Sequence, residues 1–108
     1  ISVAKKQVEI VVKDYLRTLR NNKISVERAI LYGSQAANTA DQDSDIDIVI
    51  VSDDFGRDYI KEAVHLKLLA LDVNADISPR PYSVDDYQRS KPGDFLFDEV
   101  IQKGRVVS

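Results

Sequence analysis

The chain has 108 residues, of which 44% are hydrophobic and 31% charged, values ordinary for one soluble globular domain spanning residues 1–108. The absence of cysteine excludes disulfides, thiolate metal sites and thiol catalysis, and the net charge of -3 argues against broad nonspecific nucleic-acid binding. No run approaches the roughly 20 apolar residues that span a bilayer, and the N-terminus lacks the apolar core of a signal peptide, so we expect a cytoplasmic protein without membrane contact.

The first third of the chain predicts a long helix followed by a strand. Apolar side chains recur at helical spacing from Val8 to Leu19, with charged residues filling the opposite face. Residues 26–32 are typical of a buried strand that runs into Gly33. Residues 34–40 are small and mostly unbranched, which favours a short helix.

Residues 45–51 form the clearest strand of the sequence. Isoleucines at 46, 48 and 50 point to one face, while Asp45, Asp47 and Val49 point to the other. The turn that follows leads into a second long helix over residues 58–71, in which the helical repeat consists of Ile60, Ala63, Val64, Lys67, Leu68 and Leu71.

The last third predicts short elements. Residues 73–78 fit a short strand limited by Pro79 and Pro81. A final short helix has a buried side made of Leu96, Val100 and Ile101; it stops at Gly104, and residues 106–107 suit an edge strand. The alternation of helices and strands indicates an α/β or α+β fold, with helices packed around a small β-sheet.

The aspartate pair at the start of the second predicted strand suggests a metal site. Asp45 and Asp47 are two positions apart on a strand, so their carboxylates lie on one face, with Cα atoms roughly 7 Å apart. With no thiolates available, such oxygen ligands favour a hard ion, Mg²⁺ or Mn²⁺. The alternative is that the two aspartates only solubilise the strand, although inward aspartates are costly without a ligand.

Gly33 and Ser34 suggest a phosphate site at the end of the preceding strand. Glycine permits backbone angles and close approaches that a side chain prevents, and the serine can cap the next helix and offer its hydroxyl to a phosphate. In isolation the pair is more typical of an ordinary turn with a capping serine. Together with the aspartates it describes a site for a metal-bound nucleoside triphosphate.

Asp76 is the best candidate for a third carboxylate, because its predicted strand could lie beside residues 45–51. Asp72 is the rival, at the predicted end of a helix. The alternative reading of Asp76 is a solvated aspartate. Arg57, Lys61, Lys67 and Arg80 could each contact a triphosphate, and the sequence does not choose among them. His65 and the five tyrosines are more typical of surface and packing roles.

Gly33-Ser34, ten intervening residues and Asp45-x-Asp47 reproduce the G-S-x10-D-x-D signature, and the chain resembles the minimal nucleotidyltransferases (MNT) of the DNA polymerase beta-like superfamily. The resemblance implies a mixed sheet flanked by helices, with Asp45 and Asp47 binding Mg²⁺ and Asp76 orienting or deprotonating the attacking hydroxyl. It also implies transfer of a nucleoside monophosphate from a triphosphate such as ATP.

Minimal members are often paired with a small helical HEPN-type toxin, so the resemblance also implies an antitoxin that adenylylates this partner. Two alternatives remain open: a catalytically idle module that neutralises a partner by contact, and a small-molecule enzyme of the aminoglycoside nucleotidyltransferase type. The last would need a partner domain or a homodimer to build its acceptor pocket, for which the first helix is a candidate interface.

Overall fold

The computed structural model describes residues 2–33 and 45–108 of the chain. Its elements, in chain order, are α1 (Ser2–Asn21), β1 (Arg28–Tyr32), β2 (Ile46–Ser52), α2 (Tyr59–Leu71), β3 (Ile77–Ser83), α3 (Val84–Arg89), a π-helical turn η1 (Leu96–Ile101) and β4 (Arg105–Val106). The predicted helix over residues 34–40 lies outside the described residues. Within the described ranges, no helix has both the length and the apolar character needed to cross a bilayer.

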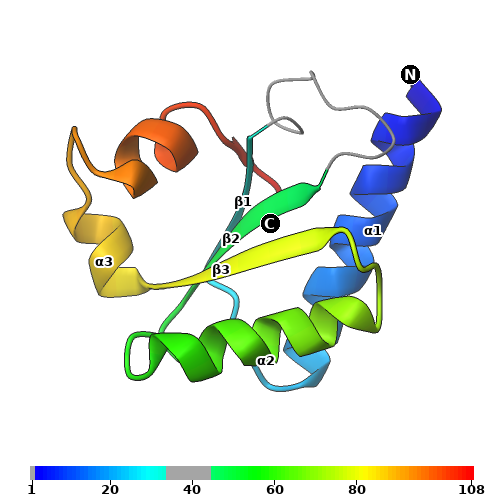
Figure 1. Cartoon of the computed structure of the whole chain (residues 1–108), viewed down its shortest axis with the longest axis horizontal. Coiled ribbons are helices and arrows are strands. Elements are labelled where there is room, and N and C mark those ends of the chain that lie inside the picture. The colour runs from blue at the N-terminus through cyan, green and yellow to red at the C-terminus, as the bar shows by residue number, and fades with distance from the viewer. Residues whose placement is uncertain (1, 34–44) are drawn as a thin grey trace.

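The four strands form one mixed sheet in the order β3-β2-β1-β4. β1 is antiparallel to both β2 and β4, whereas β2 and β3 are parallel, with Ile46 beside Ile77 and Ser52 beside Ser83. This confirms the expected small mixed sheet flanked by helices (Figure 1).

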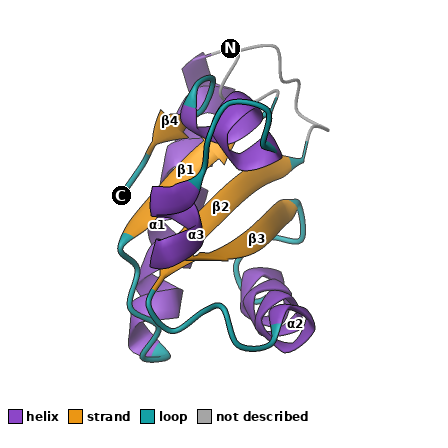
Figure 2. Cartoon of the chain, turned by 90° about the vertical axis from the view of Figure 1, so that its left-hand side faces the viewer, coloured by secondary structure: helices purple, strands orange, loops and turns teal. Residues whose placement is uncertain are grey.

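The alternation predicted for β2 divides the core between the two faces of the sheet. Ile46, Ile48 and Ile50 belong to the larger cluster, which includes the inner sides of α1 and α2. Val49 and Val51 belong to a second cluster on the opposite face, beneath η1 and α3. Helices therefore cover both faces, as the two views show (Figures 1 and 2).

Helix α2 has a clear start. The Asp58 side chain accepts a hydrogen bond from the Lys61 backbone N–H, and the Glu62 carboxylate accepts hydrogen bonds from the backbone N–H groups of residues 56–58. These contacts satisfy backbone donors that the first helical turn leaves without partners.

The side of α2 that packs on the sheet is not the side formed by the residues whose repeat predicted the helix. Leu66 and Ala70 are the buried residues of α2. Ile60, Val64, Leu68 and Leu71, which dominated the predicted repeat, are instead more than half exposed. Apolar residues occur around most of this helix, so periodicity alone did not identify its inner side.

Strand β3 continues through both prolines that were expected to end it. It lies at one edge of the sheet, where β2 is its only strand neighbour among the described residues. The carbonyl of Asp76 accepts a hydrogen bond from the Ile46 N–H. Backbone groups alternate in direction along a strand, so the N–H and C=O positions of the odd-numbered residues of β3 point to the free edge of the sheet. Pro79 and Pro81 are among them, and their missing N–H groups remove no bond to β2.

Candidate active site

Asp45 and Asp47 lie at the start of β2, on the face opposite the α1–α2 core. Asp47 is the second residue of the strand and is flanked by Tyr32 on β1 and Ser78 on β3. Asp45 directly precedes the strand and is exposed, whereas Asp47 is partly buried. The two carboxylates therefore lie near one another at one end of the central strand, as the alternation predicted.

Gly33 packs directly against the second of these aspartates. It follows β1, has a φ of 70°, and a Cβ atom built on it would lie 2.7 Å from Oδ2 of Asp47. Any L-residue at this position would combine backbone strain with a steric clash. The structure thus brings together the glycine and the aspartate of the two halves of the motif. Ser34 lies outside the described residues.

Burial is the main cause that raises the pKa of the Asp47 carboxyl, and the negative charge of Asp45 raises it further, while Arg80 opposes the shift. A partly buried carboxylate whose proton affinity is raised by a neighbouring negative charge lies in a site that a cation would stabilise. The donor atoms are oxygens, which suits Mg²⁺ or Mn²⁺. Asp45 and Asp47 therefore fit a hard divalent ion.

Asp76 lies immediately before β3 and is exposed. Its backbone N–H donates to the Asn74 side chain at 2.8 Å, and its carbonyl accepts from Ile46 at 2.8 Å. Continuing the parallel register by one position places Asp76 beside Asp45. Among residues 2–33 and 45–108, however, no three carboxylate or imidazole groups gather closely enough to hold a metal ion. Asp72, the rival, is the C-cap residue of α2.

Arg80 is the cation that the structure places beside the aspartates. It pairs with Val49 in the register, on the same sheet face as Asp47, and its charge acts on the Asp47 carboxyl. Lys67 instead donates from Nζ to the carbonyls of Ala75 and Ile77, at 3.0 and 2.6 Å. Of the four cations left open by the sequence, Arg80 is therefore the one whose charge acts on the Asp47 carboxyl.

Aromatic side chains hold Arg80 in place. Its guanidinium lies 4.8 Å from the ring centroid of Phe95, which in turn makes an edge-to-face contact with Tyr32 at 5.8 Å. Tyr32 is buried, and this burial raises the pKa of its hydroxyl to about 12, with smaller effects from Arg80 and Asp47. Its packing role agrees with the expectation for the tyrosines. Sequence reasoning missed Phe95, because nothing local marks its contact with a distant arginine.

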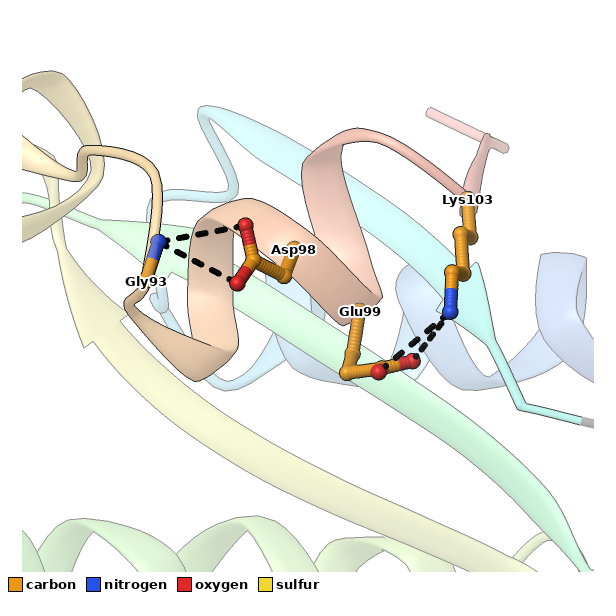
Figure 3. A network of polar contacts seen from close by, with 4 residues as sticks. All are labelled: Gly93, Asp98, Glu99 and Lys103. Carbon is orange, nitrogen blue, oxygen red and sulfur yellow. Dashed lines mark hydrogen bonds and ion pairs between the residues drawn. The ribbon is translucent and has the colours of Figure 1, made fainter.

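Polar contacts around η1 fix the turn that carries Phe95. The Asp98 carboxylate accepts hydrogen bonds from the Gly93 N–H at 3.3 and 3.1 Å, and Lys103 pairs with Glu99 at 3.3 Å (Figure 3). Leu96 and Val100 of the same turn are buried against the sheet. Hydrogen bonds and packing thus hold the residues before and after Phe95, which positions the aromatic ring beside β1.

Comparisons with known proteins agree with this fold. A model of a family described as the nucleotidyltransferase domain matches residues 5–97. No curated protein matches the chain significantly. Among solved structures, a candidate nucleotidyltransferase from Sulfolobus solfataricus is similar, with a TM-score of 0.67 and 12% identity over 95% of this chain and 81% of that chain. A toxin–antitoxin structure with AMP-PNP has a TM-score of 0.58 and 22% identity, over 93% of this chain and 72% of that one.

Proposed function

This chain belongs to the nucleotidyltransferase domain family, and we propose that it transfers AMP from ATP to a hydroxyl of a helical HEPN-type toxin, acting as its antitoxin. The observation that carries the proposal is the contact of Gly33 with Asp47, because it joins the two halves of the sequence motif in space. The similar fold of a toxin–antitoxin structure that contains AMP-PNP supports the choice of nucleotide and of partner class.

In the proposed reaction, the acceptor hydroxyl attacks the α-phosphorus of ATP. A bond forms between the acceptor oxygen and phosphorus, the bond to the bridging oxygen of the β-phosphate breaks, and pyrophosphate leaves. A carboxylate accepts the hydroxyl proton. We assign this role to Asp76, which lies beside Asp45 in the strand register, at the same end of the sheet. Gly33 allows the Asp47 carboxylate to approach the backbone after β1, where the triphosphate would bind.

We assign Mg²⁺ to Asp45 and Asp47, with Mn²⁺ as a substitute. A bound divalent ion would offset the negative charge on the phosphate oxygens during displacement. Asp45 and Asp47 would hold that ion at one end of β2. Asp76, the third ligand expected from the sequence, does not gather with them among the described residues, so its proposed role is that of proton acceptor. Arg80, kept in position by Phe95, would bind the phosphate oxygens that become the leaving group.

The acceptor is proposed to be carried by another molecule. On the sheet face that carries Asp47, many of the described residues belong to the second core cluster, which packs under η1 and α3. We propose that the nucleotide binds beside Asp47, while the acceptor hydroxyl would be brought by a docked protein. A small-molecule acceptor of the aminoglycoside type is the alternative within the same chemistry.

The test is a transfer assay with ATP labelled at the α-phosphate, in the presence of Mg²⁺, with and without the protein encoded beside this chain. We expect the label to become covalently attached to that protein. ATP labelled at the γ-phosphate is the matched control, and its label should not be transferred, because it leaves with pyrophosphate. Asp47→Asn should abolish the transfer.

Three other results would each contradict the proposal in a different way. Label on a small molecule would favour the aminoglycoside-type reading. Transfer at the wild-type rate by Asp45→Asn or Asp47→Asn would remove the metal-site assignment. Neutralisation of the toxin without any transferred label would show that the chain acts as an idle binding module.

A further inference from the structure

An apolar stripe runs along the outer side of α2. It consists of Ile60, Val64, Leu68 and Leu71, whose exposed fractions are 73%, 52%, 57% and 52%. Spacings of four, four and three residues place these side chains in one row on a helix. Contiguous apolar rows of this kind on a protein surface mark interaction sites, because leaving them in water is unfavourable.

The stripe is not needed for the core of this chain. Leu66 and Ala70 make the inward contacts of α2, on the opposite side of the helix. The helix lies at the periphery of the molecule, beside the edge strand β3, so its outer side is accessible to another molecule (Figures 1 and 2). α1, by contrast, turns most of its described apolar side chains inward and leaves only Ile10 strongly exposed among them.

The charges on one flank of the stripe are self-complementary. At about 100° of rotation per residue, Lys61, His65 and Asp72 lie on the same flank of the stripe. All three are exposed; Lys61 is in the first turn and Asp72 is the C-cap residue. If a second α2 packed antiparallel against the first, two-fold symmetry would place Lys61 of each copy near Asp72 of the other.

We propose that two copies of this chain associate through α2, with the stripes packed antiparallel about a two-fold axis and Lys61 paired with Asp72 of the second copy. A two-fold interface uses the same patch on both copies, so a self-complementary patch is what it requires. α2 covers the sheet face opposite Asp45 and Asp47, so this pairing leaves the candidate active site open. A single helix pair is smaller than a standard interface of about 1,600 Å², so we expect weak, concentration-dependent dimers.

The first test measures the mass of the full chain in solution over a wide range of concentration by sedimentation. The wild type should shift from monomer to dimer as concentration rises. The double variant Val64→Glu/Leu68→Glu should stay monomeric and keep its thermal unfolding temperature, because both side chains are exposed. Ile10→Glu, which places the same charge at an exposed apolar position of α1, should still dimerise.

The second test uses charge reversal to identify the antiparallel arrangement. Lys61→Asp and Asp72→Lys should each weaken the dimer at least several-fold, since each opposes like charges across the axis. The double variant should restore dimerisation. Mixing the two single variants should also produce a heterodimer, because one copy then carries two negative and the other two positive flanking charges.

A chain that remains monomeric at every concentration would overturn the proposal. So would a dimer that survives Val64→Glu/Leu68→Glu, or single charge reversals that are not rescued by combination. If the wild type stays monomeric while the stripe variant loses binding to the protein encoded beside this chain, the stripe belongs to an interface with a different protein.

Discussion

A Cβ atom at position 33 would lie 2.7 Å from Oδ2 of Asp47, so the backbone that follows β1 is in direct contact with the second carboxylate of β2. Gly33 also has a φ of 70°, a conformation that L side chains rarely adopt. The glycine of the motif is therefore needed for two reasons at once: the turn it makes and the carboxylate it touches.

We predict that Gly33→Ala lowers the rate of nucleotide transfer about 100-fold or more. The added methyl group must displace the Asp47 carboxylate or the turn, and a shift of about 1 Å at a reacting site can have an effect of this size. Single-turnover transfer rates at saturating ATP measure it.

Gly93→Ala is the matched control for this substitution. Gly93 also has a positive φ, of 100°, but a Cβ atom there would have no neighbour within 4 Å. This variant should lose some stability through backbone strain and retain transfer. Equal losses of transfer in the two variants would mean that positive φ alone, and not contact with Asp47, explains the effect.

Asp47→Asn should stabilise the metal-free protein at neutral pH while abolishing transfer. The pKa of Asp47 is raised in the folded state from its ordinary value of 3.8, so the ionised carboxylate is less favourable in the folded than in the unfolded chain. This destabilisation is present above the raised pKa and is lost as the pH falls through it towards 3.8 and below.

Thermal unfolding of the wild type and Asp47→Asn without metal, followed from pH 7 to pH 3, measures the difference. The two unfolding temperatures should converge at low pH. Added Mg²⁺ should raise the unfolding temperature of the wild type more than that of the variant. A metal-free variant less stable than the wild type at pH 7 would contradict the inferred penalty.

Asp76→Asn should abolish transfer while part of the Mg-ATP binding remains, because the proposed role of Asp76 is to accept a proton from the hydroxyl. Asp72→Asn should have little effect, since Asp72 caps the C-terminus of α2. Binding by calorimetry and transfer by label separate the two properties. The reverse pattern would exchange the roles of these aspartates.

Arg80→Ala should weaken ATP binding by roughly 10- to 100-fold, as expected for the loss of charge-assisted hydrogen bonds of about 1.5–3 kcal/mol. Arg80→Lys should recover part of the affinity, because it retains the charge but not the guanidinium group that lies over Phe95. Lys67→Ala is the comparison, because Lys67 binds backbone carbonyls at the edge of the sheet. If Lys67→Ala weakens ATP binding as much as Arg80→Ala, Arg80 is not the phosphate contact.

Gly104→Ala should destabilise the fold without a specific effect on chemistry. A Cβ atom there would contact the Val100 carbonyl and would lie 2.6 Å from Cγ2 of Ile30 and 2.8 Å from the Leu31 carbonyl. Overpacking of this kind typically costs about 1–3 kcal/mol. Denaturant unfolding measures the loss, and transfer rates measured well below the unfolding temperature should remain close to the wild type. An unchanged free energy of unfolding would contradict the packing described around η1 and β4.

Much of the fold followed from local patterns in the chain. Helix α1 and the alternation of β2 could be predicted because each has one apolar side and one polar side, and a side chain's direction follows from the period of the element. β3 could be predicted only in part. Proline excludes a strand from the middle of a sheet, but whether it is tolerated depends on a free edge, and that edge exists only once the strands have assembled.

The sequence by itself determined the family, because the number of residues between Gly33 and Asp45-x-Asp47 is a property of the chain. It also determined that the two aspartates share one face, because they are two positions apart on a strand. Only the tertiary structure decided three further points. It placed Gly33 against Asp47, and it brought β3 beside β2 so that the Arg80 charge acts on Asp47. It also turned Leu66 inward, so that the Ile60–Leu71 stripe faces outward. Each depends on contacts between residues far apart in the chain, which no local period encodes.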